Sequence, residues 1–302
     1  MPLTEKLSGV YVAAVTPLTP GLTPALEYIP KLMRFYADRG AQGALILGTT
    51  GEGPSFGLDE RRAIYRAAAE IKADHPDFSL LAGTGIPSLE DTIALNRFVF
   101  ELGYDGAVVL PPYYFRTASE DGLYAWFSQV IEASIPEGGK LLGYHFPQVA
   151  GVGLSTPLLT RLASDYPEQF GGIKDSSGDQ AHGQETARDF PYHSVLVGSD
   201  RLMSAVLSAG GAGCITALAN LISPLLREIY EQHELGNDTS AFQQKADAAR
   251  SVLDDMAPFP AAIKGLLAEM HDFPLWPVKP PLLSFSANRI KAAAEKLRRI
   301  LE

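Results

Sequence analysis

Short runs of hydrophobic residues alternate along this chain with longer stretches in which hydrophobic residues recur at helical spacing. The short runs are typical of buried strands, and they occupy residues 10–15, 44–47, 80–82, 107–110, 141–144, 172–174, 195–197 and 213–216. The longer stretches indicate helices at residues 58–72, 89–102, 122–134 and 156–166, with Ser88 and Ser155 at two N-cap positions. About eight strand–helix units predict an α/β fold of the (β/α)8 TIM-barrel type.

The C-terminal part of the chain has a different pattern. After about residue 224 the strand signals stop, and helical patterns follow at residues 225–235, 241–256, 261–270 and 287–301. No serine- or glycine-rich linker separates this part from the rest. We therefore expect a barrel over residues 1–223 that carries the active site, and a C-terminal helical appendage over residues 224–302 packed on it.

Four of the predicted strands run directly into loops of glycine, hydroxyl-bearing or aromatic residues. Their sequences are GTTGEG (48–53), PPYYF (111–115), YHFP (144–147) and KDSSGD (174–179). Barrel enzymes place their chemistry at the C-terminal ends of the strands, so we expect these loops to converge. Lys174 then stands at a strand end, where desolvation favours a neutral, nucleophilic amine that attacks a ketone to form a Schiff base. Lys264 and Lys279 lie in the helical part, and we interpret both as structural.

In this order along the chain, the four loops are similar to those of the N-acetylneuraminate lyase and dihydrodipicolinate synthase family of class I pyruvate-dependent aldolases and lyases. The resemblance extends from about residue 9 to about residue 224. It implies a TIM barrel, no cofactor, and a Schiff base on Lys174. It also implies that Tyr144 shuttles protons with help from Thr50 and Tyr114. Because the family tyrosine at Tyr114 crosses a dimer interface, the resemblance implies a homo-oligomer, either a dimer or a tetramer.

The same resemblance implies a set of substrate contacts. Thr49 and Thr50 match residues that bind the pyruvate carboxylate, and Ile215 matches a position whose backbone contacts pyruvate. Asp200 matches an aspartate that binds substrate hydroxyls in sialic-acid lyases, and Ser176 offers one more hydroxyl contact. Glu52 has two interpretations, as a polar residue of the site or as a carboxylate that braces the loop.

One departure from the family bears on the substrate. Dihydrodipicolinate synthases carry an arginine two residues after the proline of the tyrosine motif, and here Val149 occupies that place. Valine cannot make the bidentate contact with a carboxylate that arginine makes. Arg201 stands where sialic-acid lyases have a glutamate, which disfavours a sialic acid as substrate.

The resemblance and these departures predict a reaction. We expect a lyase that reversibly cleaves a hydroxylated 2-keto acid, either a 2-keto-3-deoxy sugar acid or a 4-hydroxy-2-keto acid, to pyruvate and an aldehyde. A dihydrodipicolinate synthase, a 2-keto-3-deoxy acid dehydratase and a non-catalytic small-molecule sensor are the alternatives. The presence of all four matched residues argues against the sensor, because a sensor needs no nucleophile; they are Lys174, Tyr144, Thr50 and Tyr114.

Composition and charge limit which classes of partner and which cellular compartment fit this chain. The chain has 302 residues and a formal net charge of −10, which disfavours nucleic acid as a partner. No uncharged apolar stretch is long enough to span a membrane, and no spacing of histidine, cysteine and carboxylate residues suggests a metal site. The single cysteine, Cys214, fits a reducing compartment, and the N-terminus lacks a signal-peptide pattern, so we expect a cytoplasmic protein.

Overall fold

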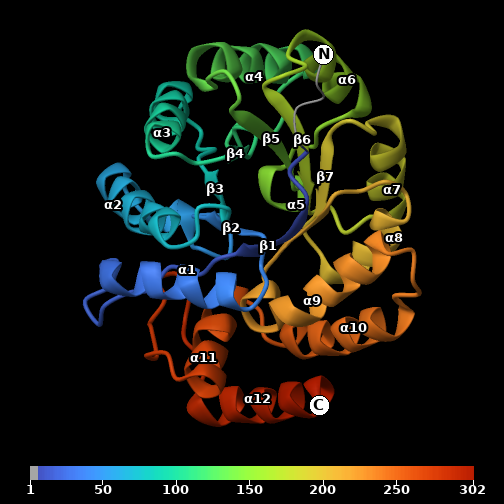
Figure 1. The fold of residues 1–302 in the computed structure, drawn as a ribbon. Helices are drawn as coiled ribbons and strands as arrows, with labels where there is room; N and C mark the ends of the chain where they lie inside the picture. Colours follow the sequence, from blue (N-terminus) through green and yellow to red (C-terminus); the bar gives the residue numbers. More distant parts are fainter. Residues whose placement is uncertain (1–5) are drawn as a thin grey trace.

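Eight parallel strands form a closed barrel in the structure, a computed structural model that describes residues 6–302. They are β1 (Gly9–Ala13), β2 (Gly43–Ile46), β3 (Ser79–Gly83), β4 (Gly106–Val109), β5 (Lys140–His145), β6 (Phe170–Asp175), β7 (Ser194–Val197) and β8 (Gly213–Thr216). Because β1 pairs with both β2 and β8, the sheet has no free edge. The predicted TIM barrel is confirmed (Figure 1).

Helices surround the barrel and connect its strands (Figure 1). They are α1 (Ile29–Asp38), α2 (Leu58–Ala69), α3 (Leu89–Glu101), α4 (Glu120–Ser134), α5 (Pro147–Ala150), α6 (Thr156–Asp165), α7 (Gln180–Asp189), α8 (Met203–Leu207) and α9 (Ala219–Glu234). Single 3-10 turns are η1 (Leu26–Tyr28), η2 (Gly53–Ser55), η3 (Glu70–Ala73) and η4 (Asp200–Leu202). Both predicted N-caps are confirmed, because the hydroxyls of Ser88 and Ser155 accept backbone N–H bonds from the first turns of α3 and α6.

The strands carry two separate apolar layers because successive side chains point to opposite faces. One layer fills the barrel interior and includes Tyr11, Leu45, Leu81, Leu142, Tyr144, Leu196 and Ile215. The other, larger layer lies between the strands and the helices. Side chains that point inward at the strand ends therefore reach the site, and their neighbours in sequence face the helices.

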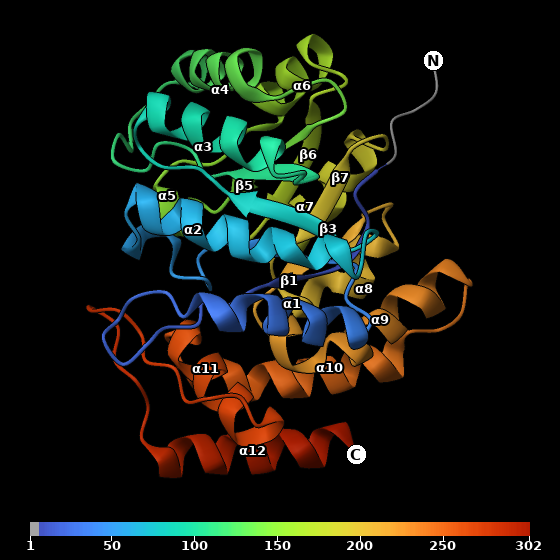
Figure 2. The ribbon, with the colours of Figure 1, turned by 60° about the vertical axis from the view of Figure 1, so that its left-hand side comes forward.

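The C-terminal part consists of helices that pack against one side of the barrel, as Figure 2 shows. After α9 come α10 (Ser240–Asp254), α11 (Phe259–His271) and α12 (Ala287–Leu301). The predicted boundary between residues 223 and 224 falls inside α9, where Ile222 has non-helical dihedral angles and Pro224 lacks an N–H donor. The division into two parts stays a prediction. Among residues 6–302, no helix is both long and apolar enough to cross a membrane.

His271, at the end of α11, predicts a loss of stability in acid. Its ring lies against Phe35, with the ring centroids 5.0 Å apart. Burial, together with the positive charges of Arg39 and Arg298, lowers the pKa of His271 from 6.5 to about 4. A lowered pKa means that the unfolded chain takes up this proton more readily than the folded protein does, so His271 destabilises the fold as pH drops below about 6.5.

We therefore expect the free energy of unfolding to fall more between about pH 7 and pH 4.5 for the parent than for His271→Gln. The two losses should differ by at most about 2.5 kcal/mol, and solvent screening of the partly exposed ring makes the difference smaller. Urea denaturation at both pH values measures it. Equal losses in the two proteins would contradict the assignment to His271.

Candidate active site

Lys174 and Tyr144 lie side by side near the ends of two neighbouring strands. Tyr144 of β5 is in register with Lys174 of β6. Both residues are buried, with exposed fractions of 6% and 3%. The Nζ atom of Lys174 lies 4.2 Å from the centroid of the Tyr144 ring. The residues matched to the nucleophile and the proton carrier are therefore in contact at the C-terminal end of the barrel.

The hydroxyl of Tyr144 sits among groups that favour its ionised form. Burial by itself would raise the pKa of Tyr144. The positive charge of Lys174 and contacts of the hydroxyl with Thr49, Lys174 and Ser176 outweigh this, and hold the pKa below its usual value. A phenol with a lowered pKa gives up and regains a proton more readily near neutral pH.

The threonine that meets Tyr144 is Thr49. It lies in the loop that follows β2 (residues 48–53, hereafter the β2 loop), and its Oγ1 is 3.2 Å from the Tyr144 hydroxyl. Thr50 is buried, with an exposed fraction of 7%, and its side chain is not the one in contact with that hydroxyl. The structure thus places Thr49 beside the Tyr144 hydroxyl, and the relay role that the resemblance implies for Thr50 stays a prediction. Two identical neighbouring residues differ here because the loop turns between them.

The remaining residues matched by the resemblance are distributed over the molecule. Ile215 of β8 is fully buried in the inner layer of the barrel. Tyr114, in the connection between β4 and α4, is 78% exposed, and its ring packs edge-on against Phe115. The structure therefore puts Tyr114 on the surface of the single chain, and its relay role stays a prediction about a second copy.

Asp200 and Arg201 are both bound by α10. Asp200 is fully buried, and its Oδ2 accepts a hydrogen bond of 2.9 Å from Arg250. Arg201 donates to Ser251 at 2.9 Å and to Asp254 at 3.0 Å. The other carboxylate oxygen of Asp200, Oδ1, has no hydrogen-bond partner within residues 6–302. A contact between Asp200 and a substrate hydroxyl stays a prediction, and this arrangement does not favour it.

A group of side chains that sequence reasoning missed lies directly behind the candidate site. His145 and Asp175 follow Tyr144 and Lys174 in their strands, so their side chains point to the opposite face. There they meet His182 of α7. Its Nδ1 is 2.9 Å from Asp175 Oδ2, and its ring stacks on that of His145 with centroids 4.4 Å apart.

Histidine and aspartate often bind metals, and the possible ligand atoms of these three residues lie within 4.8 Å of one another. The hydrogen bonds favour a proton-bridged cluster instead. The N–H of Leu154 donates to His145 Nδ1 at 2.9 Å, so a neutral His145 carries its own proton on Nε2. The hydrogen bond to Asp175 raises the pKa of His182, and burial lowers that of His145. These shifts favour a charged pair of His182 and Asp175 beside a neutral His145 ring.

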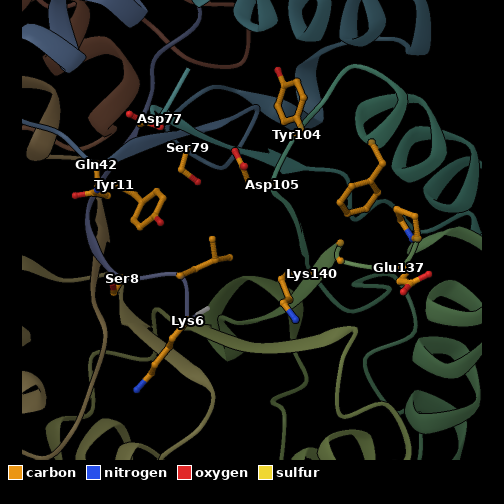
Figure 3. A pocket seen from close by; sticks show the side chains of 15 residues that line it. Lys6, Ser8, Tyr11, Gln42, Asp77, Ser79, Tyr104, Asp105, Glu137 and Lys140 are labelled. Carbon is orange, nitrogen blue, oxygen red and sulfur yellow. The ribbon is translucent and has the colours of Figure 1, made fainter. Parts of the chain in front are cut away.

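A cavity of about 640 Å³ lies at the opposite end of the barrel, where the strands begin. Figure 3 shows Tyr11, Asp105 and Lys140 around it, together with the N-terminal segment from Lys6. It opens at the starts of β1, β3 and β5, whereas Lys174 lies near the end of β6. This cavity is therefore separate from the candidate active site.

Comparisons with known proteins agree with this geometry. A model of the dihydrodipicolinate synthetase family matches residues 6–300. A DapA-like lyase of Chloroflexus aurantiacus is 36% identical over 294 residues, which cover 97% of each chain. A 4-hydroxy-tetrahydrodipicolinate synthase of Listeria innocua is 33% identical over 308 residues, which cover 98% of each chain.

Solved structures agree as well. YagE, an E. coli prophage protein of the dihydrodipicolinic acid synthase family in complex with pyruvate, has a TM-score of 0.90 at 25% identity, covering 97% of this chain and 98% of that one. A catalytic lysine mutant of a Ruminococcus gnavus sialic acid aldolase shares the fold, with a TM-score of 0.91, 20% identity, and coverage of 100% and 99%. The chain therefore belongs to the dihydrodipicolinate synthetase family, and it is a class I, pyruvate-dependent lyase that works through a lysine Schiff base.

Proposed function

We propose that this enzyme reversibly cleaves a hydroxylated 2-keto acid, either a 2-keto-3-deoxy sugar acid or a similar 4-hydroxy-2-keto acid, into pyruvate and an aldehyde. The observation that carries the proposal is the contact between buried Lys174 and Tyr144, whose hydroxyl also meets Thr49. An amine nucleophile and a phenol that exchanges protons are the two groups that cleavage through an imine requires.

The proposed reaction uses these groups in sequence. The amine of Lys174 attacks the C2 carbonyl carbon of the keto acid, and water leaves as the protonated imine forms. The Tyr144 phenolate takes the proton of the C4 hydroxyl, the C3–C4 bond breaks, and its electron pair moves toward the imine while the aldehyde departs. The enamine then takes that proton back from the Tyr144 hydroxyl at C3, and water hydrolyses the imine, which releases pyruvate and restores the amine of Lys174. Thr49 stabilises the Tyr144 phenolate by donating a hydrogen bond to it.

The segment after β5 favours a hydroxylated substrate over one with a second carboxylate. Val149 of α5 is 41% exposed and offers no charge at the position where the synthases carry arginine. Arg201 does not replace that charge, because Ser251 and Asp254 already bind its guanidinium group. The far end of the substrate is then held by hydroxyl contacts, with Ser176 as one proposed donor.

We expect aspartate semialdehyde to be a poor acceptor for pyruvate. A missing charge-assisted contact costs roughly 1.5–3 kcal/mol, or about one to two decades in kcat/KM. A pyruvate-release screen over a panel of 2-keto acids, run beside the condensation reaction on one enzyme preparation, makes the comparison. Val149→Arg should improve the condensation, and Val149→Leu is the matched control.

The second candidate is a 4-hydroxy-tetrahydrodipicolinate synthase, because the Listeria innocua relative carries that name. Efficient condensation with aspartate semialdehyde, and no cleavage of any keto-deoxy sugar acid, would establish it in place of the lyase. Arg116 is then the cation to test as the carboxylate contact, because its side chain packs against Gly151, close to Val149. A dehydratase on the same imine would release no pyruvate from its substrate, so the screen separates it too.

We also propose a cytoplasmic homo-oligomer in which Tyr114 of one copy completes the site of another. The 78% exposure of Tyr114 on the single chain supports the interface, and the buried single cysteine, Cys214, suits a reducing compartment. Sedimentation of the parent and of Tyr114→Ala tests the assembly.

A further inference from the structure

Glu52 belongs to the same β2 loop as Thr49, but the C-terminal part of the chain binds its carboxylate. One carboxylate oxygen pairs with Nζ of Lys264 in α11, and the side chains of both residues are fully buried. The other oxygen accepts the backbone N–H of Lys279 at 2.8 Å. Nζ of Lys264 also donates to the carbonyl of Pro277 at 2.8 Å, so one ammonium ties the loop to two C-terminal segments.

The backbone of Glu52 adopts a conformation that a glutamate does not choose by itself. Its φ of 57° and ψ of 30° lie in the left-handed region, where a Cβ atom is crowded and glycine is preferred. The surrounding contacts hold it there: its N–H donates to the carbonyl of Thr49, and its own carbonyl accepts the N–H of Ser55. The side-chain contacts with Lys264 and Lys279 therefore fix the turn that presents Thr49.

A fully buried ion pair is a weak source of stability, because removing two charges from water offsets most of their attraction. Burial lowers the pKa of Lys264, and the negative charge of Glu52 opposes that shift. Well-packed uncharged residues of similar shape often stabilise a fold equally well. What the charged pair supplies instead is a fixed geometry, since each oxygen of Glu52 has one defined donor.

We propose that Glu52 and Lys264 are positioning residues of the active site, through which the C-terminal helical part holds the β2 loop in its reactive conformation. The pair keeps Thr49 within 3.2 Å of the Tyr144 hydroxyl and orients the loop amides toward the keto acid carboxylate. This inference rests on the proposed roles of the β2 loop and Tyr144. Under this inference, the helices that follow the barrel help to position the residues that carry out the reaction.

The first test is the double variant Glu52→Gln/Lys264→Met, which removes both charges and leaves neither one buried alone. We expect it to unfold at a urea concentration close to that of the parent, because its shape is kept. The half-saturating pyruvate concentration for borohydride trapping on Lys174 should rise about 10-fold or more, since small displacements of positioning groups are costly. A folded double variant with the parental half-saturating concentration would overturn the inference, because a purely structural pair predicts that result.

Glu60→Gln is the matched control. Glu60 binds the Lys279 ammonium at 2.8 and 3.0 Å, so the variant loosens the same C-terminal segment without touching Glu52. We expect it to keep the parental half-saturating concentration. An equal rise in Glu60→Gln would also overturn the inference, because general loosening would then explain the effect.

A second measurement does not need Glu52→Gln/Lys264→Met to fold. Glu52→Gln, Thr49→Val and their combination form a double-mutant cycle on kcat/KM for pyruvate release. If Glu52 acts through the β2 loop, adding Glu52→Gln to Thr49→Val should cost much less than Glu52→Gln alone. Additive losses would contradict the inference. A parent enzyme that traps no pyruvate would instead defeat the proposed function, so the two failures are distinguishable.

Discussion

Borohydride reduction in the presence of pyruvate is expected to attach the three-carbon unit to the peptide that contains Lys174, and Lys174→Ala is expected to lose this labelling completely. The expectation follows from the burial of Lys174 and from its contact with the Tyr144 ring at 4.2 Å. Reduction converts the reversible imine into a stable amine, so digestion and mass spectrometry identify the residue.

Other lysines serve as controls for this experiment. Lys279→Ala should label as the parent does, because the Lys279 ammonium is bound by Glu60 and lies outside the proposed chemistry. Lys264 is also fully buried, but its Nζ is engaged with Glu52 and with the carbonyl of Pro277. Labelling that persists undiminished in Lys174→Ala would remove Lys174 from the mechanism and redirect attention to Lys264.

The sequence predicts the framework of this site well because the framework follows local rules. Alternating short apolar runs and amphipathic stretches predict a barrel, and a residue at a strand end is expected at the C-terminal face. The strand-end rule singles out Lys174, whereas the resemblance to the family singles out Tyr144, and the structure places the two residues in register. Strand boundaries differ by one or two residues, as for β6, predicted at 172–174 and found at Phe170–Asp175, because pairing with neighbouring strands extends a strand beyond its apolar run.

Details within the loops depend on contacts that no local pattern reports. Thr49 and Thr50 are chemically alike, and only the turn of the β2 loop decides which hydroxyl meets Tyr144. Asp200 is matched to a substrate contact, but the packing of α10 brings Arg250 to its carboxylate. The partners Glu52 and Lys264 are 212 residues apart, so their pairing required the folded chain.

The cluster of His145, Asp175 and His182 behind the site is predictable from the sequence only in part. Strand alternation does predict that His145 and Asp175 turn away from the face that carries Tyr144 and Lys174. It does not predict that His182 of α7 meets them, because that depends on how the helix packs. Sequence periodicity therefore gives the direction of a side chain, and packing supplies its partner.

Tyr144→Phe is expected to keep the fold and to bind pyruvate, but to lose about 10²–10⁴-fold in kcat for pyruvate release, the usual contribution of general acid–base catalysis. The change removes one oxygen atom and leaves the ring in its place beside Lys174 and Phe146. What is lost is the hydroxyl whose pKa Lys174, Thr49 and Ser176 hold below its usual value.

Steady-state kinetics and borohydride trapping of the same preparation separate chemistry from binding. The trapping experiment should show that Tyr144→Phe still accepts pyruvate on Lys174 when given enough time, while turnover of a keto-deoxy sugar acid is nearly lost. Thr49→Val serves as the graded comparison, because it keeps the Tyr144 phenol and removes only one of its hydrogen-bond partners. Its loss of kcat should be smaller than that of Tyr144→Phe. A Tyr144→Phe enzyme that turns over at close to the parental rate would reject the proton-shuttle role and leave Lys174 to work with another acid–base group.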